Sequence, residues 1–365
     1  MKYLPIFLLP LCIEAGLFHA LVKEGCTFDD ETNSYQCTKI RKFFPKMYYG
    51  DYRLNCELCD LRVFNKDTFS HRNALLMFNV TGSNMENITN HAFENLRNLQ
   101  HIHLERNKII NVSENAFAGL RHVYELHLEF NNIENLTEGF LNNFEANSVY
   151  ISYNKLVTIP PGVFKGLHGV MSMDFSHNLI INLEKGSFWN VNGIEILNLS
   201  NNKLCSLPLG VFSNIQTLRD LNLSNNKFKT FPIGVFSPLK NLVFLNLSHN
   251  YFSEFDSSLI LPLRILSRLD ISGNGIQYLD TIKLHQNVPT LRHLVINDNL
   301  WRCYQLGNVI QELRKVNVDV SDFSYERFDI MNINGVACTD MEFSEVFPVE
   351  EYLKFVTKYS SQYYC

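Results

Sequence analysis

The sequence lacks the features that define several large classes of protein. Its 365 residues carry a formal net charge of only -5, and so small a charge argues against partners such as nucleic acid or an anionic membrane surface. It contains no glycine-rich phosphate loop, no HExxH motif and no GxSxG motif. We therefore expect a protein that is not an enzyme and needs no cofactor.

Long hydrophobic runs are also scarce. The run from Tyr3 to Ile13 follows Lys2 and precedes small residues that end at Ala20, as in a secretion signal. It is shorter than the ~20 apolar residues of a membrane-spanning helix, although an uncleaved anchor helix is the alternative. No later segment reaches that length, and the chain does not close on the apolar tail of a lipid-anchor signal. We predict a soluble, secreted, extracellular protein with a signal peptide at residues 1–20.

An asparagine recurs at a nearly constant interval. The intervals are 24, 23, 24, 24, 24, 24, 24 and 25 residues, and the positions are Asn107, Asn131, Asn154, Asn178, Asn202, Asn226, Asn250, Asn274 and Asn299. The surrounding pattern, clearest from Ile194 to Leu207, is LxxLxLxxNxLxxL, the leucine-rich repeat, whose period falls within roughly 20–29 residues. Stacked repeats bury their leucines in one continuous core. We predict a leucine-rich-repeat solenoid of about ten coils at residues 74–300, a curved horseshoe with a parallel β-sheet on its concave face.

A phenylalanine series runs in step with the asparagines. Its intervals are 24, 23, 24, 24, 24 and 24 residues, and its members are Phe93, Phe117, Phe140, Phe164, Phe188, Phe212 and Phe236. The shortened intervals of the two series overlap between Asn131 and Phe140, so the back of one coil has lost a residue. We expect the phenylalanines to pack behind the leucines. We also expect the asparagine amides to bond backbone groups that the bend leaves unpaired, from coil to coil.

Cysteines concentrate at the two ends of the repeats, where a solenoid needs caps. Three pairings of Cys26, Cys37, Cys56 and Cys59 are possible, and we prefer Cys26–Cys37, closing a hairpin, with Cys56–Cys59. A single CxxC with no second one favours a structural cap over a redox or zinc site. We expect residues 21–73 to form a disulfide-bonded N-terminal cap in an oxidising compartment.

A helix is expected after the last asparagine. Leu306, Val309, Ile310 and Leu313 share one helical face, which should cover the final coil. Residues 301–340 then form the C-terminal cap, with Cys303 paired to Cys338. Residues 341–365 are expected to form a short helix and a tail, the helix docking either on the cap or on a second chain.

Two further cysteines have no evident partner in the sequence. Cys205 lies beside the inward Leu204, and we interpret it as a shielded free thiol. Cys365 is the last residue and follows a polar run, which suits an intermolecular disulfide. We predict a covalent dimer through Cys365.

Seven glycosylation sequons map the free surface, at Asn79, Asn87, Asn111, Asn135, Asn198, Asn222 and Asn246. The last three occupy one concave position of neighbouring coils, because side chains alternate along a strand. Glycans there would obstruct the middle coils, so we expect a protein ligand to avoid them. The alternative is that Leu-Asn-Leu-Ser is a favoured repeat filler that creates sequons by accident.

The concave positions of the earlier coils differ in kind. They combine histidine, carboxylate and aromatic side chains, and matching positions should stack as neighbours, His103 beside His127 and Glu105 beside Glu129. Histidines gain charge between about pH 5 and 8, so binding there could respond to pH. The alternatives are a solvated face without a partner and a metal site of His103, His127 and a carboxylate. We expect a protein-binding patch without a metal, formed by His101, His103, Glu105, Arg106, Glu125, His127, Glu129, Phe130, Tyr150, Tyr153, Asp174 and His177.

The chain resembles secreted leucine-rich-repeat proteins, including Toll-like receptor ectodomains and, more closely, insect leucine-rich-repeat immune proteins. The resemblance lies in the Cys26/Cys37 hairpin, repeats such as Leu221–Phe228 and Leu245–Asn250, and the cap sequence Asn297–Cys303. It implies an innate-immune recognition or scaffold protein, since members form disulfide-linked complexes and present complement-like proteins. The chain lacks the coiled coil of longer members, and its C-terminal cap has two cysteines where four are usual. The alternative is an extracellular matrix or cell-adhesion protein in development or tissue structure.

Overall fold

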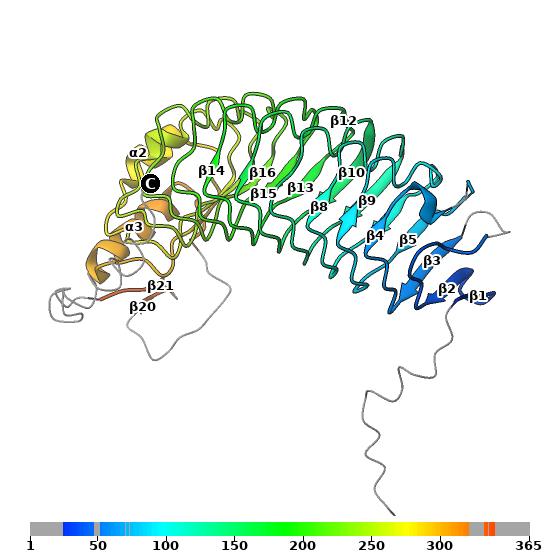
Figure 1. Ribbon diagram of the computed structural model, residues 1–365. Coiled ribbons are helices and arrows are strands. Elements are labelled where there is room, and N and C mark those ends of the chain that lie inside the picture. Colours follow the sequence, from blue (N-terminus) through cyan, green and yellow to red (C-terminus); the bar gives the residue numbers. More distant parts are fainter. Residues whose placement is uncertain are drawn as a thin grey trace, which may run out of the picture.

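The structure is a computed structural model that describes residues 25–46, 52–69, 71–72, 74–320, 332–334 and 336–339. It shows a curved arc of stacked coils (Figure 1). The expected signal peptide, the expected helix and tail at residues 341–365, and Cys365 with its expected disulfide all lie outside the described residues.

Each of the ten expected coils contributes one strand to a continuous parallel sheet, and the predicted solenoid is confirmed. The strands pair in register, so that Leu197 lies opposite Leu221 and Leu221 opposite Leu245. The middle residue of each three-residue strand is buried and its two neighbours are partly or fully exposed, as the alternation of strand side chains requires. The strands are β5 (Met77–Asn79), β7 (His101–His103), β9 (Val123–His127), β10 (Phe144–Tyr150), β13 (Ser172–Asp174), β15 (Ile196–Asn198), β16 (Asp220–Asn222), β17 (Phe244–Asn246), β18 (Arg268–Asp270) and β19 (His293–Val295).

The phenylalanine series packs behind the sheet. All seven members are buried, and three successive pairs of rings stack, with centroids 5.0 Å apart for Phe93–Phe117, 6.3 Å for Phe164–Phe188 and 6.2 Å for Phe212–Phe236. On the return side, short strands pair in parallel: β4 (Val63–Phe64) with β6 (Asn87–Ile88), β6 with β8 (Asn111–Val112), β11 (Thr158–Ile159) with β14 (Asn182–Leu183), and β12 (Leu167–His168) with β10. The core is therefore one continuous apolar layer that no coil could bury alone.

The asparagine series forms the hydrogen-bonded ladder that its spacing predicts. The Asn131 amide nitrogen donates to the carbonyls of Leu104 and Leu128, both at 3.0 Å, and its oxygen accepts from the Ile109 N–H at 3.0 Å. These groups lie where the strand bends and the backbone ladder stops, so the side chain supplies partners that the backbone lacks. The same bonds recur at Asn154, Asn178, Asn202 and Asn226.

The parallel sheet begins earlier than the sequence indicates. A hairpin of β1 (Gly25–Asp29) and β2 (Ser34–Thr38), with a Cys26–Cys37 disulfide, pairs through β2 with β3 (Arg53–Glu57), and β3 pairs with β5. Leu54 lies opposite Phe78, which aligns Cys56 with an inward apolar position and Cys59 with the ladder position. A Cys56–Cys59 disulfide joins these two sites.

One further coil thus precedes the expected ten. Its back is the 3-10 helix η1 (Lys66–Thr68) followed by buried Phe69, which lies 24 residues before Phe93. The Phe69 ring packs on Phe78 at 5.7 Å and stacks with Phe44 at 4.7 Å. The cap therefore continues the repeat core with phenylalanine.

At the other end, helices replace the extended return path. The 3-10 helix η2 (Ser257–Ile260) and helix α2 (Thr281–Asn287) bury Ile260 and Leu284, which take over from phenylalanine in the back series. Helix α3 (Cys303–Lys315) buries the four-residue face expected from the sequence. A Cys303–Cys338 disulfide holds the segment of β20 (Asn332–Ile333) and β21 (Val336–Ala337) beside α3.

The interpretation of Cys205 as a free thiol is wrong. Cys205 is half-buried and takes part in a disulfide. It follows the fully buried Leu204 and is itself only partly exposed.

Candidate functional site

The concave residues of the coils that contain β7, β9, β10 and β13 form three adjacent columns, which together we call the concave patch. The register places His101 opposite Glu125, His103 opposite His127, and Tyr150 opposite His127 on the other side. Ile102 and Leu126 point inward and are fully buried, so their strand neighbours face outward. Coil spacing alone therefore brings together side chains that are distant in the sequence.

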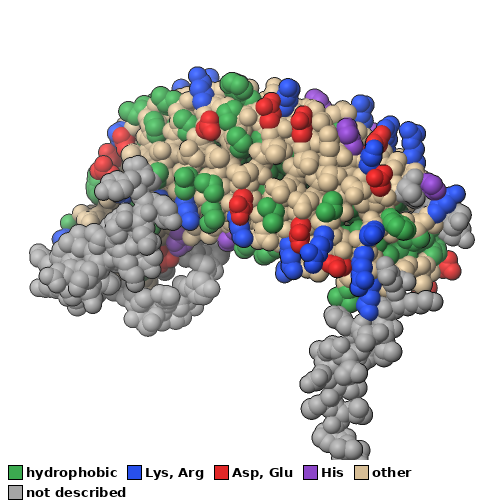
Figure 2. Space-filling view, viewed as in Figure 1, with side chains coloured by type: hydrophobic (Ala, Val, Ile, Leu, Met, Phe, Trp, Pro, Cys, Tyr) green, Lys and Arg blue, Asp and Glu red, His purple; other side chains and the backbone are tan. Residues whose placement is uncertain are grey.

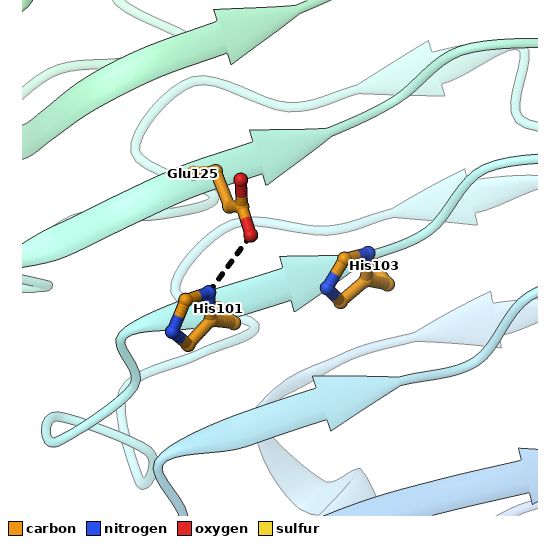
Figure 3. A group of neighbouring side chains, drawn as sticks. All are labelled: His101, His103 and Glu125. Atoms are coloured by element: carbon orange, nitrogen blue, oxygen red, sulfur yellow. Dashed lines mark hydrogen bonds and ion pairs between the residues drawn. The ribbon is translucent and has the colours of Figure 1, made fainter.

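A network of histidines and glutamates occupies two of these columns. The Nδ1 atom of His101 lies 2.9 Å from Oε1 of Glu125, and Nε2 of His127 lies 3.4 Å from the other oxygen of Glu125. The Nδ1 atom of His127 hydrogen-bonds Glu129 at 2.9 Å. Glu125 thus bridges His101 on β7 and His127 on β9. Figure 3 shows its contact with His101.

A third carboxylate, that of Glu105, belongs to the network beside those of Glu125 and Glu129. Oε1 of Glu105 lies 3.5 Å from Nδ1 of His103. The second oxygens of Glu105 and Glu129 are buried and have no hydrogen-bond partner among the described residues. Three carboxylates therefore face a group of imidazoles, and two carboxylate oxygens still have bonding capacity.

The titration of these groups reflects their contacts. Burial lowers the pKa of His127, but the hydrogen bonds and negative charges of Glu129 and Glu125 outweigh burial and raise it above its ordinary value. Burial raises the pKa of Glu125, but hydrogen bonds from His101 and His127 outweigh burial and lower it. The pKa of Glu105 is lowered in the same way, against burial, by its hydrogen bond with His103. The contacts favour the ionised forms of Glu105 and Glu125 and the protonated form of His127.

Ring stacking orders the middle column. The rings of His103 and His127 are 4.7 Å apart and nearly parallel at 10°, and the rings of His127 and Tyr150 are 4.7 Å apart at 19°. Both faces of the His127 ring are therefore covered, and both of its nitrogens have carboxylate partners. His127 is held more firmly than the other histidines of the patch.

A third column consists of the residues that precede the ladder asparagines. The Arg106 guanidinium lies 4.6 Å above the Phe130 ring, and Phe130–Tyr153 and Tyr153–His177 stack with centroids 4.2 and 4.0 Å apart. Phe130 and Tyr153 are 41% and 43% exposed. An exposed stack of aromatic rings capped by arginine has the composition of a protein-binding hot spot.

The backbone at this third column is strained for the residues it carries. Arg106, Phe130, Tyr153 and His177 have φ values of 57°, 55°, 55° and 52°, in the left-handed region, where asparagine stands at the matching Asn201 and Asn225. Large aromatic residues in this conformation cost roughly 1–3 kcal/mol each. Stability does not account for Phe130 and Tyr153 at these positions, and such strain is typical of functional surfaces.

One expected patch residue has a different role. The Asp174 carboxylate accepts from the Ser176 N–H at 2.7 Å, which stabilises the turn after β13. Asn198, Asn222 and Asn246 make the same bond to the residues two positions on, at 3.1, 3.0 and 2.9 Å. Asp174 therefore belongs with this series of turn residues and lies outside the histidine–glutamate network.

Sequence reasoning missed two features of the concave face. Tyr124, which is 51% exposed, lies with its ring 5.4 Å from His101 and extends the patch at the start of β9. Farther along, Arg268 lies 4.9 Å over the Phe244 ring, and burial raises the pKa of Asp220 against the opposing charge of Arg268. Asp220, Phe244 and Arg268 share one strand position with His101 and Glu125, so counting that position through every coil would have found them, whereas Tyr124 lies one residue before that position.

The charges elsewhere are dispersed. On the face shown in Figure 2, acidic and basic side chains are scattered among uncharged ones. Of the sequon asparagines, Asn111 and Asn135 are exposed, and the remaining five are partly exposed. Among the described residues no helix has the length and apolarity to cross a membrane.

The arc of parallel coils and its ladder define the class of protein. The family model described as Leucine rich repeat matches residues 54–109, 73–133, 145–204 and 193–252, more than half of the chain, so the protein belongs to the leucine-rich-repeat family. The first match begins in the coil of β3, in agreement with the extra coil seen in the structure. No curated protein matches the sequence.

Solved structures share the fold at low sequence identity. The chain is similar to FLRT2 in an octameric complex with Latrophilin 3 and Unc5D, with a TM-score of 0.68, 22% identity, and coverage of 87% of this chain and 96% of that one. It is similar to Toll in the Toll–Spatzle complex from Drosophila, with a TM-score of 0.61, 23% identity, and coverage of 71% and 35%. It is similar to TLR13 in a complex with single-stranded RNA, with a TM-score of 0.53, 22% identity, and coverage of 62% and 35%. At these identities the likeness shows the fold alone.

Proposed function

We propose that this chain is a secreted protein-binding solenoid of innate immunity, a recognition or scaffold protein, and that the concave patch contacts its protein partner. The observation that carries the proposal is the exposed stack of Arg106, Phe130, Tyr153 and His177, held in a strained conformation beside the histidine–glutamate network. Rigid aromatic rings give large contact area at a low cost in conformational entropy. Disulfides at both ends of the solenoid suit an oxidising, extracellular compartment.

The test compares capture of partners by the wild type and by two double variants. In Phe130→Ala/Tyr153→Ala the exposed stack is removed. In Tyr251→Ala/Tyr278→Ala two tyrosines that are 49% and 64% exposed, both outside the concave patch, are removed. We expect a protein captured from body fluid, identified by mass spectrometry, that binds the wild type and the control and is lost from the patch variant. Equal capture by both variants would show that the patch is not the partner surface.

An extracellular adhesion or matrix protein is the second candidate function. The observation that favours it is the nearly full mutual coverage with the leucine-rich-repeat chain of FLRT2, which is seen in complex with Latrophilin 3 and Unc5D. Transcript induction after microbial challenge favours the immune role. Constant expression confined to one tissue favours adhesion.

The glycosylation proposal concerns the same concave face. Asn198, Asn222 and Asn246 lie side by side on β15, β16 and β17, and neighbouring strands are only about 4.8 Å apart, so three adjacent glycans would crowd one another. We expect partial occupancy. Because even one glycan would obstruct the coils of β15, β16 and β17, a protein ligand would be left with the concave face from β7 to β13. Peptide mapping before and after glycan removal tests this, and three unmodified asparagines would end the proposal.

A covalent dimer through Cys365 completes the proposed organisation. Non-reducing electrophoresis should show a dimer for the wild type and a monomer for Cys365→Ser. Disulfide mapping should place Cys365 in an intermolecular bond. A bond from Cys365 to Cys205 of the same chain, or a monomer in both lanes, would refute the dimer.

A further inference from the structure

We propose that His101, His103 and Glu125 form a binding site for one divalent transition-metal ion, with Zn²⁺ as the ion that the donor set fits best. The site lies on the concave face between β7 and β9 (Figure 3). Two imidazoles and one carboxylate are a donor set that suits zinc. The inference stands on the geometry of these residues and does not require the proposed partner.

The donors are close enough to converge on one ion. One ligand atom from each of the three side chains lies within 4.8 Å of the others. Zinc binds nitrogen and oxygen at about 2.0–2.2 Å, which sets donors about 3.3 Å apart in a tetrahedral site. All three side chains are only partly buried, so small torsional changes can close the remaining gap.

The backbone holds the three residues in a fixed relation. His101 and His103 are two residues apart on β7, so both side chains project from the same face of the strand. Glu125 is the register partner of His101 on β9, and their side chains already meet at 2.9 Å. The ladder of parallel strands makes this arrangement a property of the solenoid and not of a mobile loop.

Each proposed ligand except His101 also has a second contact that orients it. Nδ1 of His103 lies 3.5 Å from Glu105, which leaves its other ring nitrogen as the donor to the metal. Glu125 contacts His127 at 3.4 Å, and His127 is in turn fixed by Glu129 at 2.9 Å. Such outer contacts set the ring orientation and basicity of metal ligands in known sites.

Charge supports a cation at this place. Glu105, Glu125 and Glu129 lie within one network, and the second oxygens of Glu105 and Glu129 are buried without a hydrogen-bond partner among the described residues. A divalent ion beside them would offset the excess of carboxylates. A metal that binds the folded chain and not the unfolded one would also stabilise the fold.

The structure selects a different ligand set from the His103–His127 pair that the sequence offered. His127 is stacked between His103 and Tyr150, and both of its nitrogens contact carboxylates. It therefore acts as a positioning residue behind Glu125. Three protein donors leave at least one coordination position open on the concave face, for water or for a donor from a partner.

The experiment uses the full chain, purified without a polyhistidine tag and stripped of metal with a chelator. Titration calorimetry with Zn²⁺ should show one ion per chain, and Co²⁺ in its place should give the visible absorption of a tetrahedral site. Affinity should fall at least tenfold in His103→Ala and in Glu125→Gln, and by about 10–100-fold in His127→Gln. His249→Ala and His293→Ala, which change histidines outside the patch, should bind as the wild type does.

Two results would overturn the site. One is the absence of Zn²⁺ binding by the wild-type chain. The other is full binding by a His101→Ala/His103→Ala double variant, which would assign the ion to other groups. Circular dichroism of the metal-free variants checks that they fold, and His103→Gln serves if an alanine variant does not. Zinc binding without partner capture, or capture without zinc, separates this proposal from the proposed function.

Discussion

Removal of one ladder asparagine should unfold the arc locally, and Asn202 is the clearest case. Its amide nitrogen donates to the carbonyls of Phe175 and Leu199, both at 3.0 Å, and its oxygen accepts from the Ile180 N–H at 3.0 Å. The side chain is 8% exposed, so water cannot replace these bonds without opening the coil. Asn202→Ala leaves the buried Ile180 N–H unpaired, at roughly 1–3 kcal/mol, while the carbonyls of Phe175 and Leu199 each keep one bond, from Asn178 and Asn226.

We therefore expect Asn202→Ala to lower the free energy of unfolding by roughly 1–3 kcal/mol. Equilibrium denaturation followed by circular dichroism measures the loss. Hydrogen exchange should place it in the coils of β13, β15 and β16, because each coil contacts only its neighbours. Asn192→Ala, at an exposed position, is the matched control and should change stability by less than about 0.5 kcal/mol. A loss below about 1 kcal/mol for Asn202→Ala would contradict the role given to the ladder.

Two further substitutions test local features of the fold. Asp256 caps η2 through the Ser258 N–H and pairs with Lys283, contacts that lower its pKa to about 2. The carboxylate therefore stabilises the fold above the unfolded-state pKa, so Asp256→Ala should cost about 1 kcal/mol at neutral pH. That difference should shrink as pH falls from about 4 towards 2, and a constant difference in thermal denaturation would contradict it. Gly166 has a φ of +77°, and an added Cβ would lie 2.8 Å from the Asn143 backbone nitrogen. Gly166→Ala should lower stability by roughly 1–3 kcal/mol, and an unchanged melting temperature would argue against the clash.

The fold could be predicted from the sequence because each coil repeats one set of spatial requirements. The ladder position needs a side chain that both donates and accepts, and the back of the coil needs a large apolar ring, so Asn and Phe recur with the coil itself. The extra coil was missed because Cys56 and Cys59 stand where leucine and asparagine would be expected. Phe69 carried the signal, since it continues the phenylalanine series.

The site was less predictable than the fold. Coil spacing placed His103 beside His127, but it could not show that Glu125 bonds two histidines, because that depends on side-chain torsions. Asp174 was expected in the patch because an exposed carboxylate suits binding. Its carboxylate instead accepts a hydrogen bond from the Ser176 N–H in the turn after β13, which residue type alone does not reveal. Cys205 was misread because sequence places it beside a buried leucine without showing which way its side chain faces.

The most direct test of the account is differential hydrogen exchange of the chain, free and bound to its captured partner. The concave patch as partner surface predicts slower exchange at β7, β9 and β10 and in the turns that follow them. Slowing confined to the return side of the coils or to the two caps would contradict it.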